Sequence, residues 1–100
     1  MEIPPELFAH EAVHGERQLK VGVEKWWDEY LARPVFRYAE EELAHRAEYQ
    51  AYARRHPNPK KRALVLDAIA ERLAGPLYGN LVSVADARAV VANPALRFQS

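Results

Sequence analysis

The stretch VFRYAEEELAHRAEYQAYARR, residues 35–55, decides the fold because it predicts the longest helix of the chain. One set of its side chains recurs at the three- and four-residue spacing of a packed helix face: Phe36, Ala39, Leu43, Ala47 and Gln50 or Ala51. A second, more polar set stands on the adjoining face: Glu41, His45, Glu48 and Tyr52. We therefore expect a long helix that packs through the first set and carries the second set beside it.

Two helices are expected before this stretch. The first covers residues 5–19, because Pro5 suits the first turn of a helix. Its packed face is predicted to consist of Phe8, Ala12, Gly15 and Leu19, with Ala9 and Val13 beside it. The second helix is short, contains residues 26–31 and stops before Pro34, since a proline disfavours helical geometry in the residue that precedes it.

Two further helices are expected after it. HPNPKKR, residues 56–62, interrupts the helical pattern with two prolines and an asparagine, and the next helix covers residues 60–74. Its apolar positions are Leu64, Leu66, Ala68, Ile69 and Leu73. A last helix covers residues 83–92 and is opened by Ser83 with Asp86, which resemble a capping pair.

Composition limits the architecture and the partners. Of the 100 residues, 49 % are apolar and 28 % are charged, as is typical of a single folded domain. With no hairpin signal and no repeat, we expect one compact all-α domain of four or five helices over residues 1–100. The charges of the basic and acidic side chains cancel, and no apolar stretch is long enough to cross a bilayer. We therefore expect no nucleic-acid partner, no membrane segment and no signal peptide, which fits a cytoplasmic protein and leaves the oligomeric state open.

The first helix contains HEAVH, residues 10–14, which is the H-E-x-x-H pattern of zinc-dependent peptidases. Histidines four residues apart on a helix lie on the same side, so His10 and His14 can reach one metal ion. Glu11 is rotated by about 100° and can approach a water on that metal as general base. Without cysteine, a metal site must use histidines and carboxylates. The alternative is an amphipathic helix that carries two surface histidines and no metal.

A catalytic zinc needs a third protein ligand and an open fourth position. Glu41 is the first candidate for that ligand, because it shares a face with His45 and Glu48 on the long helix. Glu42, His45 and Glu48 remain alternatives as ligands. His45 could instead hold Glu41 or donate to the substrate oxygen, which makes it a candidate catalytic residue. The competing reading is that Glu40, Glu41 and Glu42 form a solvated acidic patch near the start of the helix.

HEAVH followed by a glutamate-bearing helix resembles the gluzincins, and at this length the minigluzincins. The chain is also similar to small metallopeptidases of phages and prophages, which share HExxH, WWxxYL, PxFR, a glutamate-rich helix ending in RAEY, and PLYGN. Those pieces are here residues 10–14, 26–31, 34–37, 40–49 and 76–80. The chain departs from that pattern at Leu43, where relatives carry an acidic residue, at His45, where they carry a tyrosine, and in having no room for strands before the first helix.

The resemblance implies one zinc ion held by His10, His14 and Glu41, with Glu11 as general base. It implies hydrolysis of a peptide bond in a peptide or protein substrate, in the bacterial host cytoplasm if the protein is phage-encoded. The other function class is a helical phage accessory protein that binds a protein partner, with a structural or vestigial metal site. Its binding surface would be aromatic: Trp26, Trp27, Tyr30 and Phe36. The favoured interpretation of these four residues is that most of them close a small core over the first helix.

Two further groups of residues have open roles. A basic cluster surrounds the proline-rich break and is expected to complement the C-terminal end of the long helix rather than bind phosphates: Arg54, Arg55, Lys60, Lys61 and Arg62. Three tyrosines could each reach an oxyanion at a metal, and the sequence does not choose among them: Tyr49, Tyr52 and Tyr78.

Overall fold

A computed structural model describes residues 4–93, which form five α-helices, one 3-10 turn and no strand. The all-α prediction is therefore confirmed, and each predicted helix is present with its ends shifted by a few residues at most. The elements are α1 (Pro5–Val21), α2 (Val23–Ala32), α3 (Pro34–Arg55), α4 (Pro59–Leu73), η1 (Pro76–Tyr78) and α5 (Val84–Ala92). No helix within residues 4–93 is long and apolar enough to cross a membrane.

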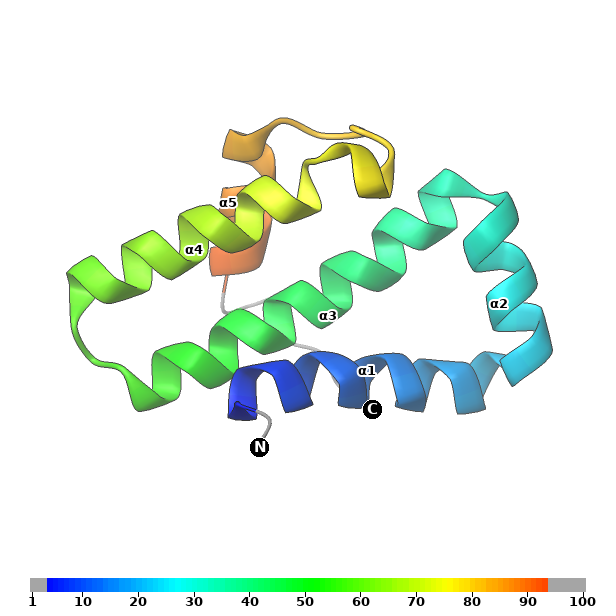
Figure 1. The fold of residues 1–100 in the computed structure, drawn as a ribbon, viewed down its shortest axis with the longest axis horizontal. Helices are drawn as coiled ribbons and strands as arrows, with labels where there is room; N and C mark the ends of the chain where they lie inside the picture. The colour runs from blue at the N-terminus through cyan, green and yellow to red at the C-terminus, as the bar shows by residue number, and fades with distance from the viewer. Residues whose placement is uncertain (1–3, 94–100) are drawn as a thin grey trace.

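The long helix α3 is the centre of the molecule and contacts every other helix. α1 and α2 lie along one side of it, while α4 and α5 lie on the other side (Figure 1). Both α1 and α4 run antiparallel to α3, because α2 reverses the chain before it and residues 56–58 reverse it afterwards. α1 and α3 therefore face each other over much of their length, which is where HEAVH meets the glutamates of α3.

Local signals explain where these helices begin. Gly22 is the single residue between α1 and α2 and has a φ of 101°, a conformation that suits glycine because it has no Cβ. The Asn58 side chain accepts a hydrogen bond from the backbone nitrogen of Lys60 at 2.9 Å and so caps α4. Ser83 accepts one from the backbone nitrogen of Asp86 at 3.0 Å, which confirms the predicted cap of α5.

The end of α3 is stabilised by a basic side chain from the next helix. Arg62 donates to the backbone oxygen of His56 at 2.6 Å and to that of Ala53. These carbonyls belong to the last turn of α3 and its cap, where the helix leaves its acceptors without internal partners. For Arg62, the expected role in complementing the C-terminal end of the long helix is confirmed.

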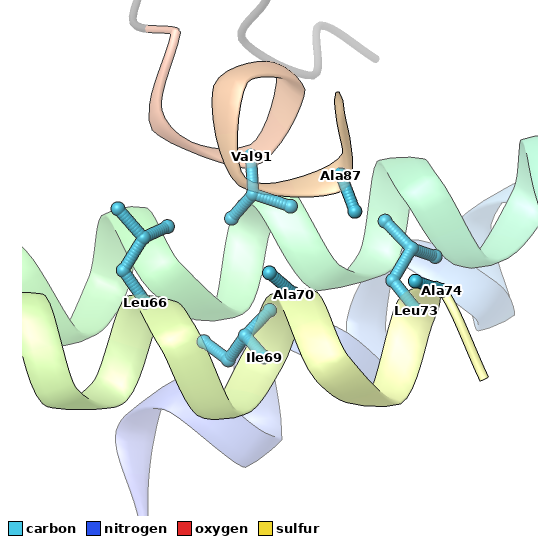
Figure 2. Close-up of a cluster of buried hydrophobic side chains, with 7 residues drawn as sticks. All are labelled: Leu66, Ile69, Ala70, Leu73, Ala74, Ala87 and Val91. Atoms are coloured by element: carbon cyan, nitrogen blue, oxygen red, sulfur yellow. The ribbon is translucent and has the colours of Figure 1, made fainter. Parts of the chain in front are cut away.

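The main hydrophobic core lies between α4 and α5 beside α3 (Figure 2). Seven buried side chains form it: Leu66, Ile69, Ala70, Leu73, Ala74, Ala87 and Val91. Partly buried aromatic side chains of α3, Tyr38 and Tyr49, pack against it. Of the apolar positions predicted for α4, Leu64 is 71 % exposed and Ala68 is exposed as well, so the face of α4 that the core uses excludes both.

The predicted packed face of α1 is wrong. Phe8 and Leu19 are 66 % and 81 % exposed, and Ala12 and Gly15 are exposed as well. The buried residues of α1 are His10 and Val13. On α3 the more polar set is likewise the better buried one, because α1 packs against the glutamates of α3. Buried carboxylates require hydrogen-bond donors, and α1 therefore turns its histidines toward them.

Candidate metal centre

The carboxylate of Glu41 is the centre of a buried polar cluster between α1 and α3. Only 4 % of Glu41 is exposed. The His14 Nε2 is 3.1 Å from Glu41 Oε1, and the His10 Nε2 is 3.4 Å from the same oxygen. The Tyr30 hydroxyl, which comes from α2, donates to Oε2 at 2.5 Å. The structure thus brings the three residues proposed as metal ligands from the sequence to one point.

His45 lies one turn beyond Glu41 and is buried, with 1 % of it exposed. Its Nδ1 donates to the backbone oxygen of Glu41 at 2.6 Å and is 3.6 Å from Glu41 Oε1. A carbonyl oxygen only accepts, so this nitrogen carries the proton. Ligand atoms of His10, Glu41 and His45 lie within 4.8 Å of one another, and this buried group could hold a metal ion. His14 adds a third nitrogen, hydrogen-bonded to the same carboxylate.

Glu48 supports His10 from the side opposite Glu41. It accepts a hydrogen bond from His10 Nδ1 at 2.8 Å and another from Arg72 Nη2, on α4, at 2.5 Å. A histidine whose Nδ1–H group donates a hydrogen bond to a carboxylate has its Nε2 available for a metal, and such pairs are common around metal sites. Glu48 stood among the alternative ligands because it shares a helix face with Glu41. The part played by Arg72 had no local signal in the sequence.

Burial and charge set the protonation of the cluster. Burial lowers the pKa of His10, but its hydrogen bonds to Glu41 and Glu48 and their charges outweigh that effect and raise the pKa to about 9. Burial raises the pKa of Glu41, yet the hydrogen bonds from His10, His14 and Tyr30 hold it well below the usual range. Burial lowers the pKa of His45 to about 4 and keeps it neutral. A proton on His10 thus balances the two carboxylates where a metal ion would do so.

The neighbouring glutamate, Glu40, is also buried, with 2 % exposed. It accepts hydrogen bonds from Trp26 Nε1 at 2.7 Å and from Arg17 Nε at 3.1 Å. Glu42 is partly buried, 3.8 Å from the Arg46 guanidinium. The reading of Glu40, Glu41 and Glu42 as a solvated acidic patch is therefore wrong, because two of them are buried and all three have partners.

The structure chooses among the tyrosines. The ring of Tyr78 contacts that of His45, with centroids 5.5 Å apart, and burial together with the charge of Glu41 raises the pKa of Tyr78 to about 12. Tyr49 packs against the hydrophobic core, and Tyr52 stacks on the His56 ring at 4.1 Å. Tyr78 is thus the one of the three beside the cluster. Tyr30 was expected only as part of the aromatic group, and its hydrogen bond to Glu41 was missed.

Glu11 is exposed, unlike the histidines on either side of it in the motif. Within residues 4–93 its carboxylate has no hydrogen-bond or ion-pair partner. It follows His10 directly on α1, and its side chain is open to solvent.

Comparison of this chain with protein-family models, with curated proteins and with solved structures gives no match.

Proposed function

We propose that this protein is a small zinc-dependent peptidase. The observation that carries the proposal is the approach of His10 Nε2 and His14 Nε2 to one oxygen of Glu41, at 3.4 Å and 3.1 Å. Two imidazoles and one carboxylate are the three protein ligands of many catalytic zinc sites, in which a fourth position stays open for water or substrate. The chemistry of the donor set therefore fits zinc.

Two of these ligands, His10 and Glu41, are held in place by further residues. Glu48 accepts the Nδ1 proton of His10, so the lone pair used for a metal lies on Nε2. Tyr30 donates to Oε2 of Glu41, which leaves Oε1 for the metal. His45 donates to the backbone oxygen of Glu41 and so positions that turn of α3. Such support is what distinguishes a prepared site from a chance meeting of side chains.

When bound, zinc would supply a Lewis acid and lower the pKa of a water molecule to about 7. Glu11 is exposed and follows His10 on α1, and as general base it would take a proton from water and return it to the leaving amine. The Tyr78 hydroxyl is protonated at neutral pH, and burial raises its pKa further, to about 12. It can therefore donate a hydrogen bond to a developing negative charge on the substrate oxygen.

The first test is the metal content of protein purified without a histidine tag, measured by elemental mass spectrometry. We expect close to one zinc ion per chain, lost in His10→Ala and in Glu41→Ala. His14→Ala should lose the metal as well, whereas His45→Ala, which removes the donor to the backbone oxygen of Glu41, should still bind it. Protein that takes up no metal, even when zinc is offered, would contradict the proposal.

The second test is the Glu11→Gln variant. We expect it to retain the metal and the fold while peptide hydrolysis falls by roughly 10²- to 10⁴-fold, the usual contribution of a general base. Glu6→Gln, on the same helix, is the matched control and should leave the rate unchanged. Equal turnover by wild type and Glu11→Gln would exclude the assigned role of Glu11.

One surface favours the second candidate function, an accessory protein that binds a protein partner. Of the four aromatic residues predicted for such a surface, Trp26 is 2 % exposed and Tyr30 and Phe36 are partly buried, so only Trp27 is exposed. Val23, Trp27 and Leu31 follow one another at four-residue spacing along α2 and are 48 %, 46 % and 70 % exposed. In that case the metal is structural, so chelation lowers the melting temperature while no peptide is hydrolysed by the loaded protein. Zinc-dependent hydrolysis that is lost in Glu11→Gln decides against it.

A further inference from the structure

A small cavity adjoins the candidate metal centre at the junction of α4 and η1. Its volume is about 220 Å³, and it is lined by Glu71, Arg72, Gly75, Pro76, Leu77 and Tyr78. Two of these residues also reach the cluster. Arg72 donates to Glu48 at 2.5 Å, and the ring of Tyr78 contacts the ring of His45. Arg72 and Tyr78 thus form the boundary between the cavity and the candidate metal centre.

The Arg72 guanidinium has donors to spare. Its side chain is 52 % exposed, whereas the Glu48 carboxylate that accepts from it is 10 % exposed. Only Nη2 makes a hydrogen bond to a described residue, so Nε and Nη1 have no partner within residues 4–93. A guanidinium presents five N–H donors in a planar fork that matches a carboxylate. The bond to Glu48 holds this fork at the cavity.

We propose that Arg72 recognises a carboxylate of the peptide substrate, in the cavity between α4 and η1. This inference rests on the proposed peptidase function and names the substrate class of that same site: peptides with an acidic side chain or a free C-terminus close to the cleaved bond. Pro76 and Leu77 supply an apolar wall for the rest of that residue, and Leu77 is 71 % exposed.

The distance from Arg72 to the cluster determines how far the recognised carboxylate lies from the cleaved bond. Glu48 bridges Arg72 and His10 through its two oxygens, with hydrogen bonds of 2.5 Å and 2.8 Å. The guanidinium is therefore within roughly two or three residues of extended peptide from a metal on His10. We expect the recognised carboxylate to stand at that separation from the cleaved bond.

The test uses the zinc-loaded full chain with Glu11→Gln, which prevents turnover, and four labelled peptides. One peptide carries a glutamate and another a glutamine at the same position, and each is made with a free or an amidated C-terminus. Fluorescence anisotropy measures the dissociation constants. We expect a carboxylate to tighten binding by roughly tenfold or more. The glutamate and the free terminus separate the two sources of that carboxylate.

Variants of the residues that line the cavity distinguish recognition of the substrate carboxylate by Arg72 from a role of Arg72 in positioning Glu48. Arg72→Gln should abolish the preference for the carboxylate, whereas Glu71→Gln, which changes the other charged residue of the same cavity, should keep it. A residue that only supports Glu48 would weaken all four peptides equally when replaced. Uniform weakening of all four peptides in Arg72→Gln would overturn the inference. So would equal or undetectable binding of the four peptides by the protein that retains Arg72, and so would loss of the preference in Glu71→Gln.

Hydrolysis by the loaded wild-type chain separates this inference from the function on which it rests. Cleavage of all four peptides at equal rates, with equal affinities, would leave a peptidase without the Arg72 subsite. Selective binding of the carboxylate peptides without cleavage of any would leave the subsite and remove the peptidase.

Discussion

Glu41 is a buried carboxylate whose two oxygens have different partners. Oε2 accepts from Tyr30 at 2.5 Å, and Oε1 is within 3.4 Å of both His10 and His14. Burying an ionised carboxylate costs several kcal/mol unless hydrogen bonds and opposite charges compensate it. The partners that make Glu41 tolerable in the interior are therefore the groups that define the candidate metal centre.

At the residue scale, Glu48 provides a test of how the ligands are held. Glu48→Gln replaces an anionic acceptor of the His10 Nδ1 proton by a neutral one. We expect zinc affinity to fall by roughly 10- to 100-fold, the usual effect of losing such a partner. Competition with a chromophoric chelator measures it. Glu42→Gln, also on α3 but paired with Arg46, is the control, and unchanged affinity in Glu48→Gln would remove Glu48 from the site.

At the element scale, the buried face of α1 differs from a hydrophobic stripe, as does that of α3. The apolar side chains of α1 at Phe8 and Leu19 are exposed, while His10 is buried beside Val13. Hydrophobic spacing predicts a face well when the neighbouring helix is apolar. α3 presents buried carboxylates instead. The histidines of α1 donate hydrogen bonds to them, and the apolar face of α1 is left exposed.

The orientation of α1 can be tested by removing side chains from its two faces. Val13→Ala empties space at a residue that is 4 % exposed, and we expect it to cost roughly 1–3 kcal/mol of the free energy of unfolding. Phe8→Ala removes a larger side chain that is 66 % exposed and should change that free energy by at most about 0.5 kcal/mol. Urea denaturation measures both. A larger loss in Phe8→Ala than in Val13→Ala would show that the apolar face predicted from the sequence is the buried one.

At the scale of the whole molecule, α3 separates two different interiors. On one side α4 and α5 enclose the hydrophobic core (Figure 2). On the other side lie α1 and α2 (Figure 1), and the polar cluster around Glu41 stands between them and α3. The first side is stabilised by apolar burial, which does not depend on pH. The second side depends on protonation, and on metal where metal is bound.

Protein stripped of metal should accordingly be most stable near pH 6.5. The pKa of His10 is about 9 in the folded chain against 6.5 unfolded, so its contribution is complete below pH 6.5 and is lost as the pH rises toward 9. The pKa of His45 is lowered to about 4, so stability also falls as the pH drops from 6.5 toward 4. Below about pH 4.5, protonation of Glu41 and Glu48, whose pKa values are lowered, adds to that loss.

The alkaline side of this profile is the informative one. The free energy of unfolding, measured with denaturant after chelation, should fall by about 3 kcal/mol between pH 6.5 and pH 9, from the pKa shift of His10. Zinc-loaded protein is the control, because a metal replaces the proton on His10 and should remove this decrease. Stripped protein that gains stability up to pH 9 would show that His10 is neutral in the cluster.

The sequence by itself determined where the helices lie and which residues could bind a metal. Helix ends depend on neighbours in the chain, such as Gly22 with its φ of 101° or the Ser83 cap, and local rules apply to them. The four-residue spacing of His10 and His14 is also local, because any helix places such a pair on one side. Helix positions and candidate ligands could therefore be read before the fold was known.

Only the tertiary structure decided which side of α1 is buried and what surrounds His10. Glu48 is 38 positions from His10 and 24 from Arg72, and no local pattern links them. The choice of Tyr78 over Tyr49 and Tyr52 likewise depends on where η1 lies against α3. The physical reason is that a buried charge takes whichever donor the packing brings within reach, and packing is a property of the whole chain.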